Sequence, residues 1–126
     1  MKRPKRSGGG EGAQHRGLKQ WVCEHPEAVG VHNVTKREME HRYASGDEVD
    51  ILFITADGMD VVVEIDTDDP LPGAYQLVKY RALRCAELGL PLDSDKVRAV
   101  LVAWTVDKQT ARFCDSYGIR WFEEKL

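Results

Sequence analysis

The stretch VDILFITADGMDVVVEID, residues 49–66, decides the fold of this chain. Two apolar runs, rich in β-branched residues, flank the turn signal ADG, so the stretch predicts a β-hairpin. Almost every position of both runs is apolar, which indicates strands that are buried on both faces. A three-residue loop at 56–58 puts Gly58 where a left-handed backbone is preferred, and Thr55 then faces Met59.

Acidic residues mark the end of this hairpin. In the three-residue register Asp50 lies directly opposite Glu64, and Asp66 lies on the same face two residues further along. A two-residue loop would instead place Asp50 and Glu64 on opposite faces. Carboxylates about 4 Å apart repel by about 4 kcal/mol at an effective dielectric constant of about 20, which a shared proton or a divalent cation would offset. Oxygen ligands suit Mg²⁺ or Mn²⁺, and the alternative is that the sheet ends here with solvated acids.

The rest of the chain alternates helix and strand patterns around the hairpin. Gly89 and Gly118 each follow a helical pattern at the position where a helix commonly ends. This order predicts an α/β fold, a central mixed β-sheet flanked by helices, in one domain over 18–126. The expected elements are a helix within 18–30, which Pro26 ends or follows with a turn, an edge strand or loop over 37–46, a helix over 73–89, a strand over 97–105, a helix over 107–118 and a strand over 119–123.

Residues 1–17 are basic and rich in glycine, and they predict a disordered tail. The first 20 positions hold six of the 18 basic residues and one of the 21 acidic residues, so the rest of the chain has a net charge of −8. The tail suits nucleic-acid phosphates, and a solvated tail without a partner is the alternative. The acidic remainder speaks against a broad basic surface for nucleic acid.

The cysteines bear on the compartment. Cys23, Cys85 and Cys114 are odd in number and widely spaced, which argues against a disulfide framework and against a zinc site. No apolar run approaches the roughly 18 residues of a membrane span. The basic N-terminus lacks the apolar stretch of a secretory signal. We therefore expect a reducing, cytoplasmic setting and no membrane partner.

Five segments together resemble the PD-(D/E)XK nuclease superfamily. GDEVDILF (46–53) and VVVEID (61–66) carry Asp50 and Glu64 at the places of the first and second acids. QLVKY (76–80) resembles the QxxxY motif of several branches. LKQWVCEHPEAVG (18–30) is similar to the leading helix of the NucS-like endonuclease branch, and ARFCDSYGIRWFE (111–123) to the closing helix and strand. The resemblance covers about residues 18–123 and implies a restriction-endonuclease-like core.

The resemblance also implies an activity, the hydrolysis of phosphodiester bonds in DNA by a Mg²⁺- or Mn²⁺-dependent endonuclease. Asp50 and Glu64 would hold the metal with the Ile65 carbonyl, and Glu24 would match a first-helix acid that some branches use as an extra ligand. Gln76 and Tyr80 share a helix face and would lie close to the site, the alternative being ordinary helix surface and packing. The implied partner is DNA, in single-stranded, mismatched or branched form, and single-domain nucleases of this size commonly pair as homodimers.

One position departs from the family pattern. Asp66 stands two residues after Glu64, where these nucleases carry a lysine that positions and activates the attacking water. Three explanations stay open. The lysine has migrated, with Lys79 as the first candidate and Lys36 as the second. Asp66 is a third metal ligand, or the domain is a nuclease fold that no longer cuts and serves as a binding and interaction module.

Overall fold

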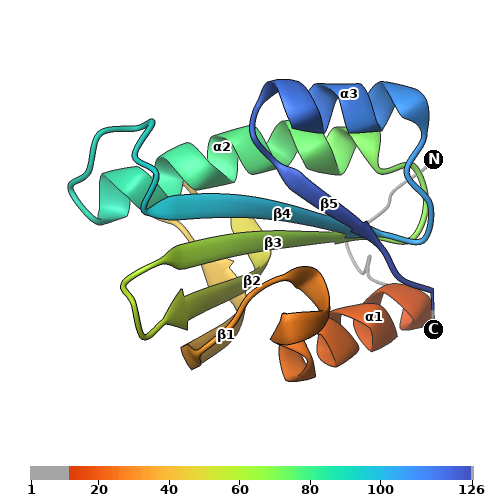
Figure 1. The fold of residues 1–126 in the computed structure, drawn as a ribbon, viewed down its shortest axis with the longest axis horizontal. Helices are drawn as coiled ribbons and strands as arrows, with labels where there is room; N and C mark the ends of the chain where they lie inside the picture. The colour runs from red at the N-terminus through yellow and green to blue at the C-terminus, as the bar shows by residue number, and fades with distance from the viewer. Residues whose placement is uncertain (1–11, 126) are drawn as a thin grey trace.

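The hairpin lies at the centre of a five-stranded sheet in the computed structural model, which describes residues 12–125 (Figure 1). The first three strands are antiparallel neighbours, and the last two run parallel to the third. The predicted central mixed sheet is confirmed, and 37–46 falls largely within an edge strand. In spatial order, which is also chain order, the strands are β1 (Val34–Arg42), β2 (Glu48–Thr55), β3 (Asp60–Asp66), β4 (Val97–Ala103) and β5 (Arg120–Glu123).

The register of the hairpin is the one that the three-residue loop predicts. Ile51 pairs with Val63, and the Thr55 N–H donates to the Met59 carbonyl over 2.9 Å. Gly58 has a φ of 85°, a backbone conformation that costs glycine little and other residues much. The β2–β3 pairing ends at Ile51, so Asp50, the preceding residue in the chain, lies just beyond the paired segment.

Helices cover both faces of the sheet, as predicted (Figure 1). Helix α1 (Ala13–Glu24) and the 3₁₀ turn η1 (Pro26–Val29) lie on one face, and α2 (Leu71–Glu87) and α3 (Lys108–Ser116) lie on the other. Alternate residues of β3 serve the two faces, because successive strand side chains point in opposite directions. Val61, Val63 and Ile65 pack with α1, and Val62 packs with α2.

Helix α1 begins earlier than the sequence suggests. Residues 13–17 were expected in the disordered tail, yet they form the first turns of α1, and residues 1–11 of that predicted tail lie outside the described residues. The N-cap is Gly12 without a side-chain cap, so no local signal announces the helix start. Tertiary packing supplies the stability instead, since Leu18 and Val22 are buried against the sheet.

Two further expectations can be compared with the structure. Cys23, Cys85 and Cys114 are buried free thiols, as their spacing suggested. Among the helices of residues 12–125, we find none with the length and apolar character needed to span a membrane.

Candidate active site

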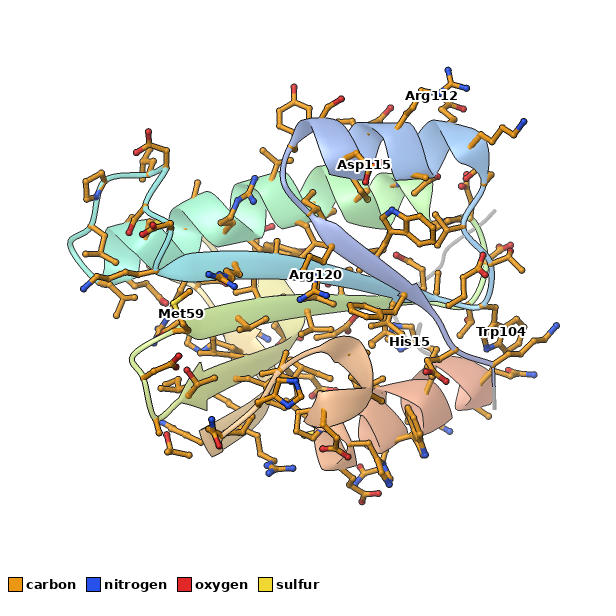
Figure 2. The ribbon with its side chains drawn as sticks, viewed as in Figure 1. His15, Met59, Trp104, Arg112, Asp115 and Arg120 are labelled. Carbon is orange, nitrogen blue, oxygen red and sulfur yellow. The ribbon has the colours of Figure 1, made fainter. Side chains whose placement is uncertain are left out.

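The candidate site lies where β3 and β4 end. These strands run parallel, so their carboxyl ends share one edge of the sheet, the usual place for a site in open α/β sheets. The Trp104 N–H, just beyond β4, donates to the Asp66 carbonyl at the end of β3 over 3.3 Å. Figure 2 shows His15 of α1 and Trp104 at this same end of the molecule. Three structural elements therefore meet at the edge that carries the acidic residues.

Asp50 is fixed by the main chain of β3. Its Oδ2 accepts the Ile65 N–H over 2.8 Å, in the place where the strand pairing has stopped. The side chain is 16% exposed, so the carboxylate is reachable from solvent yet largely enclosed. A hydrogen bond from an N–H to an ionised carboxylate is stronger than a neutral one. The negative charge of Asp50 is thus held beside the Ile65 peptide.

His15 reaches the same point from α1. Its Nε2 lies 2.9 Å from the Ile65 carbonyl oxygen and 3.4 Å from Asp50 Oδ2. Because a carbonyl oxygen only accepts, Nε2 carries the proton and donates to it. Three polar atoms, one from each of these residues, converge on a small volume at the end of β3.

Lys19 supplies positive charge next to this point. Its Nζ lies 2.6 Å from Glu40 Oε2 and 4.0 Å from Asp50 Oδ1, and the side chain is only 6% exposed. Lys19 follows His15 by four residues, so both lie on one face of α1. A buried ammonium needs paired charges to stay ionised, and these two carboxylates provide them.

Glu64 and Asp66 lie on the α2-facing side of β3. Glu64 is buried next to the α2-facing core, where its charge acts on Tyr43. Asp66 packs on the first turn of α2, since a Cβ added to Gly73 would lie 1.8 Å from Asp66 Oδ2. A carboxylate at a helix N-terminus is favourable electrostatically. The contacts of Asp50 therefore lead to α1, whereas those of Asp66 lead to α2.

The donor set for a metal is small. Within residues 12–125 there is no group of three or more His, Cys, Asp or Glu side chains placed to hold a metal ion. The donors that do converge are two side chains, Asp50 and His15, with the main-chain carbonyl of Ile65. A carboxylate, a carbonyl and an imidazole fit a divalent cation that completes its coordination with water.

The residues predicted on α2 have different surroundings. Lys79 Nζ donates to Asp47 Oδ1 over 3.0 Å at an exposed position, and hydrogen bonds from Ser45 and then Lys79 lower the pKa of Asp47. Gln76 is exposed. Tyr80 is buried and stacks on Tyr43 with ring centroids 5.9 Å apart. Lys79 thus forms a surface ion pair, and Tyr80 contributes to the core.

The Tyr43–Tyr80 contact is a core interaction. The Tyr43 hydroxyl donates to the Tyr80 carbonyl over 3.2 Å, and burial raises the pKa of Tyr43 well above its usual value. Two other candidates also lie on the surface: Lys36 is exposed on edge strand β1, and Glu24 accepts a 2.7 Å hydrogen bond from Gln20 at the end of α1. Glu24 is nine residues from His15, about 13 Å along the helix axis.

Sequence reasoning missed both residues that contact Asp50 from α1. His15 was assigned to the tail, and Lys19, in the helix expected over 18–30, was counted only in the charge of the first 20 residues. A signal was nevertheless present in HRGLKQWV (15–22): His15 and Lys19 are spaced by four and accompany the apolar pair Leu18 and Val22, also spaced by four. This pattern places a polar stripe beside an apolar stripe on one helix.

The architecture can be compared with known proteins. No family model matches the sequence, and no curated protein matches it. Three solved structures are similar: a repair endonuclease from Pyrococcus abyssi (TM-score 0.73, 19% identity, 91% of this chain), EndoMS in complex with double-stranded DNA (0.62, 26%, 84%), and EndoMS in its apo form (0.66, 23%, 92%). The chain corresponds to 48%, 43% and 48% of their lengths, about half. The fold is restriction-endonuclease-like.

Proposed function

We propose that this chain is a nuclease-like DNA-processing protein that hydrolyses phosphodiester bonds with a divalent metal. The observation that carries the proposal is the convergence of the Asp50 carboxylate and the Ile65 carbonyl at the end of β3. Both groups lie at the site edge of a fold shared with repair endonucleases. The same likeness supports DNA as the partner, since one neighbour is EndoMS bound to double-stranded DNA.

Asp50 and the Ile65 carbonyl would hold the cation, with water completing its coordination. A divalent cation bound there supplies a water of lowered pKa and neutralises the charge that develops on the phosphate. The Ile65 N–H orients the Asp50 carboxylate before the cation arrives. That orientation is the kind of prior placement on which electrostatic catalysis depends.

We propose that Lys19 replaces the missing motif lysine. Its ammonium is 4.0 Å from Asp50 and is buried, whereas Lys79 is paired with Asp47 on the surface. Glu40 also binds the Lys19 amine, over 2.6 Å. Asp66, packed against Gly73, then contributes to the contact between β3 and α2. This assignment favours the explanation in which the motif lysine has migrated, with its new position on α1 rather than on α2.

The setting and assembly follow as further proposals. Three free thiols suit a reducing compartment such as the cytoplasm. Two copies of the domain would be needed for each strand of a duplex to meet a separate site. Light scattering of the protein with and without duplex DNA measures whether the domain forms a homodimer.

Cleavage of defined DNA tests the proposal. The purified protein is incubated with intact duplex, mismatched duplex, branched and single-stranded DNA, in Mg²⁺, Mn²⁺ or EDTA. We expect metal-dependent products from at least one substrate, and their loss in Asp50→Asn. Equal products from Asp50→Asn would trace the activity to a contaminant. DNA binding without cleavage of any substrate would identify a non-catalytic binding module of the same fold.

A further inference from the structure

We infer that His15 is a nitrogen ligand of the metal site and that it makes the site prefer first-row transition cations over Mg²⁺. The inference rests on the proposed function, because it concerns the cation that Asp50 and Ile65 would hold. It adds a nitrogen ligand to a metal site for which the sequence predicts oxygen ligands only.

The distances match neighbouring ligands of one cation. In an octahedral site with bonds of about 2.1 Å, adjacent ligand atoms lie about 3 Å apart. His15 Nε2 is 2.9 Å from the Ile65 oxygen and 3.4 Å from Asp50 Oδ2. A cation bound by all three atoms therefore needs only a small adjustment of the imidazole. Nε2 would release to water the proton that it now donates to the carbonyl, and Nδ1 would take one from water, so that the neutral imidazole binds the cation through the Nε2 lone pair.

Helix α1 holds the imidazole in this place. Leu18 and Val22 anchor the helix in the core, with side chains that are 1% and 0% exposed. His15 lies one turn before Lys19, whose amine is bound by Glu40. The imidazole itself is 14% exposed, which leaves little room for other rotamers. Such a ligand is positioned before the cation binds.

The chemical class of the cation follows from the nitrogen. Mg²⁺ is bound by oxygen ligands and retains water, whereas imidazole suits transition metals. For a mixed nitrogen and oxygen site, affinity rises from Mn²⁺ through Co²⁺ to Ni²⁺. We therefore expect this site to bind Ni²⁺ more tightly than Mn²⁺, and Mn²⁺ more tightly than Mg²⁺.

Calorimetric titration of the untagged full chain tests this order. Mg²⁺, Mn²⁺ and Ni²⁺ are titrated into the wild type, His15→Ala and His15→Gln, with His41→Ala as the control, because His41 is as enclosed as His15 (14% exposed) but is engaged by Glu38 and Glu87. His15→Gln retains an N–H donor for the Ile65 carbonyl. We expect both His15 variants to bind Ni²⁺ at least about tenfold more weakly, since even residues that only orient a ligand carry effects of this size. Affinity for Mg²⁺ should change by less than about twofold, within the scatter of surface effects.

Each outcome bears on a separate claim. Unchanged or tighter Ni²⁺ binding in the His15 variants would overturn the inference, and tighter binding would show that the imidazole competes with the cation. If the wild type binds Mg²⁺ and Ni²⁺ with no dependence on His15, the inference fails while the proposed metal site stands. If no divalent cation binds the wild type at millimolar concentration, both fail. Thermal melting in EDTA shows whether each variant folds. If His15→Ala does not fold, His15→Gln still tests the inference.

Discussion

Helices α1 and α2 each carry a lysine that is paired with an aspartate, yet the two lysines have different roles. On α1, the Lys19 side chain is 6% exposed and lies between Glu40 and Asp50. On α2, the Lys79 side chain is 47% exposed and pairs with Asp47. The motif in the sequence favoured α2. The difference teaches that the packing of a helix on the sheet decides which of its charges reaches the site.

The energetics of the two pairs differ for the same reason. An exposed ion pair such as Lys79–Asp47 contributes about 0–1 kcal/mol, because water screens it and two flexible side chains are ordered. An enclosed charge such as Lys19 is costly to leave without its partners. Changes to Lys19 should therefore affect both stability and function, whereas equivalent changes to Lys79 should affect neither.

The largest effect should separate the two aspartates. Asp50→Asn removes the charge that would hold the cation, and we expect cleavage to fall by about a thousandfold, since metal stabilisation of the transition state amounts to several kcal/mol. Asp47→Asn, which makes the same chemical change at the partner of Lys79, should leave cleavage intact. Initial rates on one DNA substrate measure both. Equal losses in the two variants would mean that the site does not lie at Asp50.

The two lysines provide the next comparison. Lys19→Met should reduce cleavage by about a hundredfold, the size expected for one group that stabilises developing charge. Lys79→Met should have no such effect, because its amine is bound to exposed Asp47. Single-turnover rates at saturating Mn²⁺ measure the chemical step. A large loss in Lys79→Met with none in Lys19→Met would return the migrated lysine to α2.

Much of the fold could be predicted because local signals agreed with one another. The ADG turn set the hairpin register, and Gly89 and Gly118 lie just past the helices that they were expected to close, with φ values of 70° and 68°. The start of α1 could not be found this way. No side-chain cap marks the start at Ala13, and the helix is stabilised by contacts of Leu18 and Val22 with distant strands.

The site was predicted only in part for a related reason. Strand alternation put Asp50 and Asp66 on one face, whereas the contacts of Asp50 lead to α1 and those of Asp66 lead to α2, because the β2–β3 pairing ends at Ile51. The contacts of His15 and Lys19 join residues at least 21 positions apart, such as Lys19 and Glu40, and no local pattern encodes them. The role of Asp66 depends on Gly73, a contact that sequence spacing does not reveal.

Two helical glycines give the third comparison. A Cβ at Gly73 of α2 would lie 1.8 Å from Asp66 Oδ2, whereas a Cβ at Gly17 of α1 meets nothing within 4 Å. Gly73→Ala should destabilise the protein by about 1–3 kcal/mol through overpacking, and Gly17→Ala should stabilise it by up to about 1 kcal/mol through helix propensity. Urea unfolding measures both free energies.

A double variant shows whether Asp66 causes the cost. Gly73→Ala combined with Asp66→Ala should recover most of the lost stability, because the clashing carboxylate is gone. If Gly73→Ala alone is as stabilising as Gly17→Ala, the Asp66 side chain does not occupy the first turn of α2. Asp66 would then be available to the site, and the contrast between the α1 and α2 sides of β3 would weaken.

The smallest effect concerns the residue that holds Lys19. Glu40 has a φ of 61°, which a residue with a Cβ adopts at a cost and glycine adopts freely. Glu40→Ala and Glu40→Gly both remove the ion pair to Lys19, so their difference isolates the backbone strain. We expect Glu40→Gly to be more stable by about 1 kcal/mol in urea unfolding, because relief of the strain exceeds the entropy that glycine adds to the unfolded chain. If the alanine variant is equally stable, β1 relaxes when the pair is lost, and the Lys19–Glu40 contact itself maintains the left-handed conformation.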